Sequence, residues 1–260
     1  MMAHMTDSAP GSDAELVHLE VDGPLATITL DSPYNRNALS RQLVTELVAH
    51  VEAAGDDEGV RVVLIRSAGR VFCSGADLSE ASTGGMEEGT RAIVALQRQL
   101  LTLDKPVVTE LAGPVRAGGI GIVAASDIAI ASTEATFALT EVKLGLAAAI
   151  ISLTVHARMS PRASALTTLG GEVFTGEQAA TYGLVTAAVP PDDLEAEVRR
   201  TCESLATGAP QGLRESKRIL NRDLVERIDE RGEELAALSA RLFASDEARE
   251  AMTAFLSRSK

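Results

Sequence analysis

The amino-acid sequence predicts an α/β fold in which strands alternate with helices and a helical region follows. Short apolar runs of strand length, such as residues 60–66 and 105–112, recur between segments whose apolar residues have helical spacing. From about Ala209 the pattern becomes entirely helical, with leucine stripes and charged faces. The chain has 260 residues, of which 45% are hydrophobic, so we expect one main domain with a small appendage.

The first elements are a hairpin and a helix. Residues 16–20 and 25–30 are strand-like runs on either side of an Asp-Gly-Pro turn, which favours a β-hairpin. Residues 39–57 carry apolar side chains at helical spacing, with Ser40 as the candidate N-terminal cap and Gly55 as the expected stop.

The middle of the chain continues the alternation. The polar segment 81–90, which contains two adjacent glycines, predicts a loop that covers a site, and residues 91–103 predict the next helix. Residues 127–132 read as a strand. A further helix is expected to begin with Ser160 and Pro161 and to end at a Gly-Gly pair.

Two glycine-bearing turns are the most informative local feature. "FCSGADL" at residues 72–78 and "GPVRAGGIG" at residues 113–121 each follow an apolar strand and open a helix. Glycine allows backbone N–H groups to approach a ligand oxygen, and the positive end of a helix favours an oxygen that becomes negative. Together the turns predict an oxyanion hole, although either one alone is common where a strand packs on a helix.

Several short motifs carry a resemblance to a known family. They are "NRNAL" from residue 35, "FCSGADL", "KPVV" from residue 105, "AGG" from residue 117, "SDIAIAS" from residue 126 and "TFALTEVKLGL" from residue 136. Their order and spacing resemble those of the crotonase superfamily, the enoyl-CoA hydratase/isomerase family, closely over residues 15–190 and more loosely in the tail.

The resemblance implies an architecture and an assembly. It implies a crotonase-like spiral of repeated ββα units with a C-terminal α-helical oligomerisation region that builds trimers or hexamers. We therefore divide the chain into a disordered start that includes cloning-derived residues (1–13), a spiral core with the acyl-CoA site (14–205) and a helical region (206–260).

The same resemblance assigns roles to individual residues. It implies that the N–H groups of Ala76 and Gly118 hold the thioester carbonyl oxygen of an acyl-CoA, stabilising an enolate, and that Glu141 transfers the proton. The residues implied to bind the substrate or its CoA are Arg36, Ala38, Leu39, Ser74, Asp77, Leu78 and, from a neighbouring subunit, Phe255. No metal or redox cofactor is expected, since coenzyme A is part of the substrate.

The surroundings of Glu141 predict its chemistry. Apolar neighbours (Phe137, Leu144 and Leu146) suggest burial, which would raise the pKa of the carboxyl group. Without the resemblance, an exposed carboxylate or an ion pair with Lys143 is the simpler interpretation. The run at residues 145–153 suits an apolar acyl pocket and core filling equally well.

Position 121 departs from the family pattern. Hydratases of the family usually carry a second glutamate there, three residues after the glycine donor, whereas this chain has Gly121. An enoyl-CoA hydratase that works with one glutamate is our first expectation, a Δ3-Δ2-enoyl-CoA isomerase the second, and a non-catalytic acyl-CoA-binding protein the third. An isomerase needs only one base. Glu110 and Glu134 are nearby acids in the sequence, at positions that the family does not use.

Charge and composition exclude several classes. The formal net charge of −13 disfavours nucleic acid as a partner and requires a local basic patch for the CoA phosphates, with Arg36, Arg70 and Lys217 as candidates. The solvated-surface interpretation of Arg70 and Lys217 is the simpler one. No apolar stretch or leader pattern predicts a membrane span or export. Two separated cysteines, Cys73 and Cys202, predict neither disulfides nor a zinc site, so we expect a cytoplasmic protein.

Two rival sites fit less well. Residues 119–124 match a dinucleotide-binding glycine pattern, but five residues separate the preceding strand from Gly118. A serine protease of the related spiral fold would use His156, yet no activating serine motif accompanies it, so a core or interface histidine is the simpler interpretation.

Overall fold

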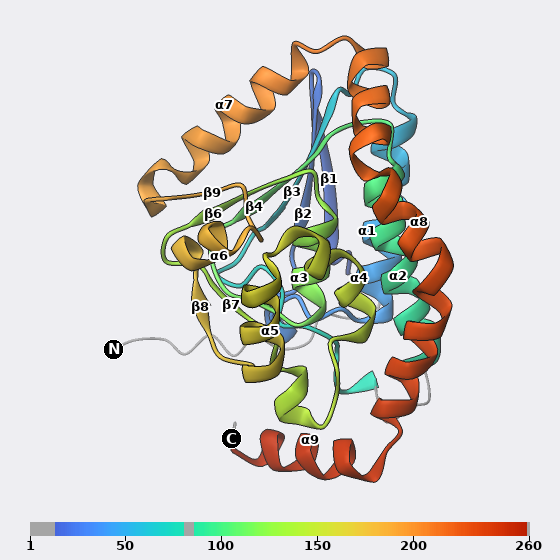
Figure 1. Ribbon diagram of the computed structural model, residues 1–260. Coiled ribbons are helices and arrows are strands. Elements are labelled where there is room, and N and C mark those ends of the chain that lie inside the picture. The colour runs from blue at the N-terminus through green and yellow to red at the C-terminus, as the bar shows by residue number, and fades with distance from the viewer. Residues whose placement is uncertain (1–13, 81–85, 259–260) are drawn as a thin grey trace.

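The computed structural model describes residues 14–80 and 86–258, and within these ranges it has two sheets with helices packed on them (Figure 1). The larger sheet has the strand order β1-β2-β3-β4-β6-β9. Only β1 and β2 pair antiparallel; each later neighbour is parallel. Parallel neighbours require crossover connections, which the intervening helices supply. The α/β fold that the sequence predicts is confirmed.

The first elements follow the sequence pattern closely, except that the first helix continues through Gly55, its expected stop, to Asp56. The strands β1 (Val17–Asp22) and β2 (Leu25–Leu30) form the predicted hairpin. A short 3-10 helix, η1 (Pro33–Asn35), leads to α1 (Arg41–Asp56), which begins after Ser40. The Ser40 hydroxyl accepts a hydrogen bond from the Leu43 N–H, so the predicted cap is confirmed.

The helix α2 starts earlier than the sequence suggests. It spans Met86–Thr102, whereas we expected a loop up to residue 90. Glu87 and Glu88 lie in its first turn, where acidic side chains interact favourably with the helix dipole, so charges that suggest a loop in fact favour a helix start. Residues 81–85 of the expected loop lie outside the described residues.

The central strands of the larger sheet are buried on both faces. In β3 (Val62–Ser67), Val63 and Ile65 belong to the main core, whereas Val62 and Leu64 face a smaller cluster with Leu194 and Val198 of α7. The strands β4 (Val107–Leu111) and β6 (Ile128–Ser132) continue this arrangement, and β9 (Ala187–Val189) forms an edge. In Figure 1, α7 (Leu194–Ala206) lies apart from the other helices, over this second face.

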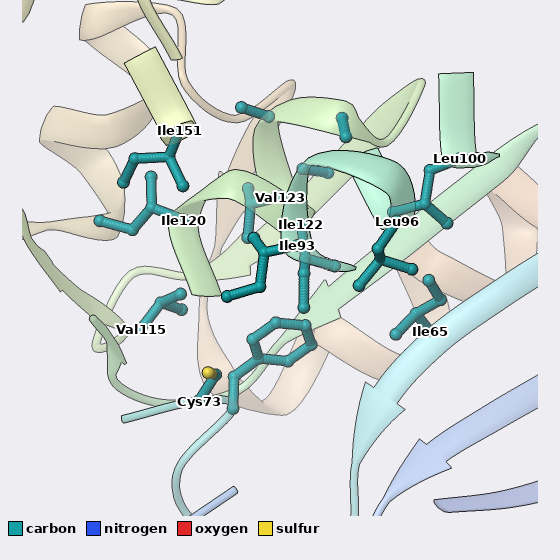
Figure 2. Packing of buried hydrophobic residues seen from close by; sticks show 14 of the residues in the cluster. Ile65, Cys73, Ile93, Leu96, Leu100, Val115, Ile120, Ile122, Val123 and Ile151 are labelled. Carbon is teal, nitrogen blue, oxygen red and sulfur yellow. The ribbon is translucent and has the colours of Figure 1, made fainter. Parts of the chain in front are cut away.

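The smaller sheet frames a buried helix. Its strands are β5 (Val115–Arg116), β7 (Thr136–Ala138) and β8 (Phe174–Thr175). The helix α3 (Gly118–Ala125) follows β5, and every residue after Gly118 is buried. Figure 2 shows Ile120, Ile122 and Val123 of α3 among side chains of α2 and Ile151 of α4. A helix that is apolar on all sides can only lie inside the protein.

The remaining elements complete the spiral and cover one side. They are η3 (Thr140–Leu144), α4 (Ala149–Arg158), α5 (Pro161–Gly170), α6 (Gly176–Tyr182) and η4 (Pro191–Asp193). The predicted start and stop of α5 are confirmed, because the Ser160 hydroxyl caps its first turn and Gly171 adopts φ 60° at its end.

The C-terminal helices pack on the rest of the chain. The long helix α8 (Pro210–Phe243) runs beside α2 and α4, and its Leu224, Ile228 and Leu235 join the main core (Figure 1). The helix α9 (Asp246–Arg258) lies against η3, where Ala248 and Met252 pack on Leu146. One partner of the leucine stripe is therefore the chain itself. The domain boundary at residue 205 stays a prediction, and the expected disordered segment 1–13 lies outside the described residues.

Candidate active site

The two glycine-bearing turns lie side by side. The Arg116 N–H donates to the Cys73 carbonyl oxygen at 2.9 Å, and Cys73 forms an isolated parallel bridge with Val115. A Cβ atom placed on Gly75 would lie 3.0 Å from the Cβ of Ala117. Segments more than 40 residues apart in the sequence are thus brought into direct contact by β-pairing and by the absence of a side chain at Gly75.

Each turn contains a residue with a positive φ just before the predicted donor. Gly75 has φ 99° and Ala117 has φ 46°, with ψ −121° for Ala117. Glycine adopts the first conformation without strain, whereas a residue with a Cβ atom is strained in the second. The Ala117 N–H donates to the Ala138 carbonyl oxygen at 3.1 Å, which helps to hold this conformation. Strained backbone is characteristic of functional sites.

The two predicted donors are free to bind a ligand. Among the described residues, neither the Ala76 N–H nor the Gly118 N–H donates a hydrogen bond to a protein acceptor. Gly118 is the first residue of α3, where the unpaired N–H groups and the positive end of the helix dipole favour an anion. Ala76, Ala117 and Gly118 all line one cavity.

The cavity has a volume of about 300 Å³ and is mostly apolar. It lies between the turns, the first residues of α1 and α4, and parts of α2 and α8. Its apolar lining comes from Leu39, Val44, Met86, Ala92, Ile93, Ala147, Ala148, Ala149, Ile150, Ile151 and Phe243. The run at residues 145–153 therefore both lines the cavity and, through α4, fills the core.

Glu141 lies on the wall of the same cavity. Its Oε2 atom is buried and has no hydrogen-bond partner among the described residues. Burial raises the pKa of the Glu141 carboxyl group from 4.5 to about 7, against a smaller lowering by a backbone N–H. A carboxyl group with a pKa near neutral pH takes up and releases protons readily.

The simpler interpretation of Glu141 does not hold. The Lys143 ammonium group pairs with Glu172 at 2.9 Å, both on the surface, and Glu141 is partly buried. The apolar neighbours differ in part from those expected, because Leu144 and Leu146 pack against α9 and Phe137 stacks on Phe174 at 5.5 Å.

Position 121 is tightly packed. A Cβ atom on Gly121 would lie 2.6 Å from the Cγ2 atom of Ile151 and 3.4 Å from the Cδ atom of Gln97. Gln97 is fully buried, and its amide donates to the Ile150 carbonyl oxygen at 3.2 Å. The space beside Gly121 thus belongs to the side chain of Ile151.

The two other acids considered near this position lie elsewhere. Glu110 is partly buried on the face of the larger sheet that α7 covers. Burial raises the pKa of its carboxyl group, Arg66 lowers it and Glu195 raises it. Glu134 is exposed. Neither of them lines the cavity within the part of the chain that the structure describes.

The "NRNAL" segment is fixed beside the first turn. Its Leu39 N–H donates to the Gly75 carbonyl oxygen at 2.8 Å, and the Ser74 hydroxyl donates to the Asn35 carbonyl oxygen at 3.0 Å. The Asn35 amide also donates to Asp77 at 3.1 Å. The side chain of Asn37 connects Ser32 with Val71. These bonds place the segment against the residues that precede and follow Ala76.

Some of the residues predicted to bind the substrate or its CoA line the cavity, and others lie away from it. Leu39 and Asp77 line the cavity. Arg36 is exposed with φ 58°, Ala38 is buried, and Ser74 is partly buried. Leu78 packs against the cluster that Leu146 forms with Ala248 and Met252 of α9. These four residues lie outside the cavity lining among the described residues. The side chain of Phe255 lies outside what the structure describes.

One phosphate-binding candidate is wrong. Lys217 is only 4% exposed, and its ammonium group pairs with Asp127 at 2.7 Å and donates to the Lys105 carbonyl oxygen at 2.8 Å. A buried, paired lysine is neither a phosphate ligand nor a solvated surface charge. Arg70 is exposed, as the simpler interpretation expects.

The sequence did not identify some cavity residues. Arg41 and Glu88 line the cavity and form an ion pair at 3.0 Å between α1 and α2. Ser239 and Phe243 reach it from α8. Arg41 directly follows Ser40 after "NRNAL", so adjacency to the motif was a usable signal. Helical spacing alone gave no signal for the α8 residues.

The rival sites receive no structural support. Residues 119–124 are buried inside α3, where a Cβ on Gly119 would lie 2.6 Å from Cys73, so no dinucleotide could approach them. His156 is exposed rather than in the core, and its Nε2 atom lies 3.4 Å from the Thr168 hydroxyl, with no serine recorded as a partner among the described residues.

Within residues 14–80 and 86–258, no group of three or more His, Cys, Asp or Glu side chains has the arrangement of a metal site. In the same ranges, no helix has both the length and the apolar content to cross a membrane.

Comparison with known proteins agrees with the geometry. A family model for enoyl-CoA hydratase/isomerase matches residues 20–260. A crystal structure of an enoyl-CoA hydratase from Mycobacterium avium is 43% identical with a TM-score of 0.88, covering 94% of this chain and 97% of that one.

Relatives with more specific names match at lower identity. The (E)-benzylidenesuccinyl-CoA hydratase of Thauera aromatica is 30% identical, with 80% of this chain and 84% of the relative aligned. The short-chain-enoyl-CoA hydratase of Clostridium acetobutylicum is 29% identical, with 94% and 95% aligned. The expected crotonase fold is confirmed, and the chain belongs to the enoyl-CoA hydratase/isomerase family.

Proposed function

We propose that the protein is an enoyl-CoA hydratase that adds water to an α,β-unsaturated acyl-CoA thioester. The observation that carries the proposal is that two backbone N–H groups, from Ala76 and Gly118, and the Oε2 atom of Glu141 meet at one apolar cavity, and that none of the three has a partner among the described residues. The names of the relatives, several of which are hydratases, support the same reaction.

The backbone donors bind the thioester oxygen. Both N–H groups donate to the carbonyl oxygen, and the bond strengthens as that oxygen becomes an enolate oxygen. Each such donor typically contributes about 10²–10³ in rate. The first turn of α3 adds the positive end of its dipole at the Gly118 side.

Glu141 supplies both proton-transfer steps. Its ionised carboxylate takes a proton from water as the oxygen of that water bonds to the β-carbon and the π electrons move onto the thioester oxygen. The protonated carboxyl group then gives the proton to the α-carbon as the enolate collapses. The net result is addition of H and OH across the double bond, and Glu141 is regenerated. A pKa of about 7 for Glu141 suits both steps.

An isomerase is the second candidate, and the packing at Gly121 favours it. Residue 121 is a glycine with Ile151 in the space beside it, and the described cavity residues of α3 and α4 include no second carboxylate opposite Glu141. Isomerisation needs one base, which removes a proton from the α-carbon of a β,γ-unsaturated thioester and returns it at the γ-carbon. A protein that only binds acyl-CoA is the third candidate.

The substrate contacts and the assembly remain part of the proposal. We place the CoA beside the "NRNAL" segment and the first turn, with Arg36 as the exposed cation nearest to them in sequence. Coenzyme A enters as part of the substrate, with no metal or redox cofactor and no nucleic acid partner. The assembly is a trimer or a hexamer, with Phe255 reaching a neighbouring site, in the cytoplasm.

One assay tests the proposal and separates the candidates. Purified protein is mixed with crotonyl-CoA and, separately, with a β,γ-unsaturated acyl-CoA, and the conjugated-enoyl absorbance is followed. A hydratase lowers the absorbance with the first substrate, and an isomerase raises it with the second. Binding of both thioesters without any absorbance change would reject both enzymes and leave the binding protein.

A further inference from the structure

A largely buried polar network lies at the end of α3 that is remote from the cavity. It consists of Asp127, Arg158, Lys217 and Asn221, and we call it the α3-end network. The Asn221 amide accepts from Arg158 at 3.3 Å and donates to Asp127 at 3.0 Å. Lys217 pairs with Asp127 at 2.7 Å. Lys217 and Asn221 are 4% and 2% exposed, so burial makes these contacts strong.

Arg158 connects this network directly to α3. Its Nε atom donates to the Ala124 carbonyl oxygen at 3.0 Å, and its Nη2 atom lies 3.4 Å from the Ser126 carbonyl oxygen. Ala124 lies in the last turn of α3, where carbonyl groups lack partners inside the helix, and Ser126 is the residue that caps its C-terminal end. A guanidinium group there satisfies the acceptors and places a positive charge at the negative end of the helix dipole.

The opposite end of α3 carries the strain. Its cap residue, Ala117, has φ 46°, a conformation that persists only when the surrounding structure holds it. The next residue is Gly118. Between the two ends, residues 119–125 of α3 are all buried, and a Cβ atom placed on Gly119 or Gly121 would lie 2.6 Å from a neighbouring side chain. A short helix packed this tightly moves as one body, so a displacement of one end reaches the other.

We infer that Arg158 is a positioning residue, which acts through α3 to fix the Gly118 N–H at the cavity. The helix has eight residues and is therefore about 12 Å long, so Arg158 does not reach the substrate. The planar guanidinium group of Arg158 donates to the carbonyl groups at the C-terminal end of α3. Its positive charge interacts favourably with the dipole of α3, whose positive end faces the thioester oxygen. This inference rests on the proposed function, because it requires Gly118 to be a donor.

The test uses a spectroscopic probe of the donors. Cinnamoyl-CoA, an aromatic enoyl thioester, absorbs at longer wavelength when its carbonyl group is polarised. The red shift on binding is measured in the Glu141→Gln background, so that the probe is not consumed. The variants are Arg158→Met and Arg158→Lys, and kcat and KM are measured separately in the Glu141 protein.

The control is Val198→Ala. Val198 lies in the cluster between α7 and the far face of the sheet, away from α3, and its truncation lowers stability without touching the network. A merely structural role for Arg158 would make both variants behave alike at equal unfolding temperature.

We expect Arg158→Met to lower kcat by up to about 30-fold, which corresponds to the full stabilisation by a cation at a partly buried helix C-terminus acting on the transition state, with a smaller change in KM and a reduced red shift. Arg158→Lys keeps the charge and recovers part of both. Val198→Ala keeps the full red shift.

The failures are distinguishable. A full red shift in both Arg158 variants overturns the inference and leaves the proposed function intact. If Arg158→Met does not fold, Arg158→Lys decides, since it loses the planar fork. A missing red shift when Arg158 is intact would reject the donor role of Gly118 itself.

Discussion

The two sides of the cavity are built on different physical principles. On one side, Gly75 and Ala117 adopt positive φ angles and present the N–H groups of Ala76 and Gly118. On the other side, Glu141 is a side chain whose protonation is set by burial. This difference determines how each side can be tested. A substitution can displace a backbone donor but cannot delete it, whereas a substitution can delete a carboxylate without moving the chain.

Glu141→Gln is expected to have the largest effect. The amide has the shape of the acid and cannot act as a base, so we expect kcat to fall about 10²–10⁴-fold, with binding of the acyl-CoA nearly unchanged. Steady-state kinetics and calorimetric titration with a thioester measure the two quantities. Wild-type turnover in this variant would mean that another group transfers the proton.

Gly75→Ala tests the backbone side. Alanine at this position must adopt φ 99°, and its Cβ atom would lie 3.0 Å from the Cβ of Ala117, so the first turn has to move. Because the Ala76 donor follows directly, we expect kcat to fall about a hundredfold, as for the loss of one oxyanion donor. Gly23→Ala is the matched control: Gly23 also has a positive φ, 53°, but no atom lies within 4 Å of its Cβ position. Equal activity losses in the two variants would contradict the account.

The pH dependence sharpens the Glu141 side. Since the ionised carboxylate takes the first proton, kcat/KM should rise about tenfold per unit below pH 7 and level off above it, given a pKa of about 7. A profile that is flat from pH 5 to 8 would contradict this assignment.

The same pKa shift predicts a stability effect with a definite sign. The folded state binds the Glu141 proton more tightly than the unfolded state does. The bound proton therefore stabilises the folded state fully below about pH 4.5, and this stabilisation is lost as pH rises through 7. The loss amounts to roughly 3 kcal/mol. Denaturant unfolding should therefore find E141Q more stable than the natural protein at pH 8 and similar to it at pH 4.

Gly121→Glu asks whether a second carboxylate can be added. The Cβ alone would meet Ile151 at 2.6 Å, so we expect the single substitution to destabilise the protein by about 1–3 kcal/mol. Gly121→Glu combined with Ile151→Ala opens the space and should regain part of the stability and raise hydration of crotonyl-CoA. A double variant no more stable than the single one would show that Ile151 is not the obstacle.

Ala117→Gly is expected to have the smallest effect. Glycine adopts φ 46° without strain, and we expect a stability gain of up to about 1 kcal/mol, measured by thermal unfolding. The freed backbone should lower kcat only a few-fold, because α3 stays packed. A lower unfolding temperature would show that Ala117 is not strained.

Local patterns predicted most of the fold and the two turns that line the cavity. The hairpin, the Ser40 and Ser160 caps, and both glycine-bearing turns were readable because each depends on neighbours in the sequence. The start of α2 was misplaced because acidic residues occur both in loops and in first helical turns.

Features that depend on distant contacts were not predictable. Lys217 resembles a surface charge in the sequence, and only tertiary packing against Asp127 buries it. Phe243 enters the cavity because α8 packs along α2, which no local pattern specifies. The occupation of the space at Gly121 by Ile151 is likewise a matter of tertiary structure.

The most direct test is a crystal structure of the protein with a bound, non-reacting acyl-CoA thioester analogue. The account predicts that the thioester oxygen lies about 2.7–3.1 Å from both the Ala76 and the Gly118 nitrogen atoms, with Glu141 facing the α- and β-carbons. A thioester oxygen bound away from either nitrogen, with the acyl chain still in the cavity, would contradict the central claim.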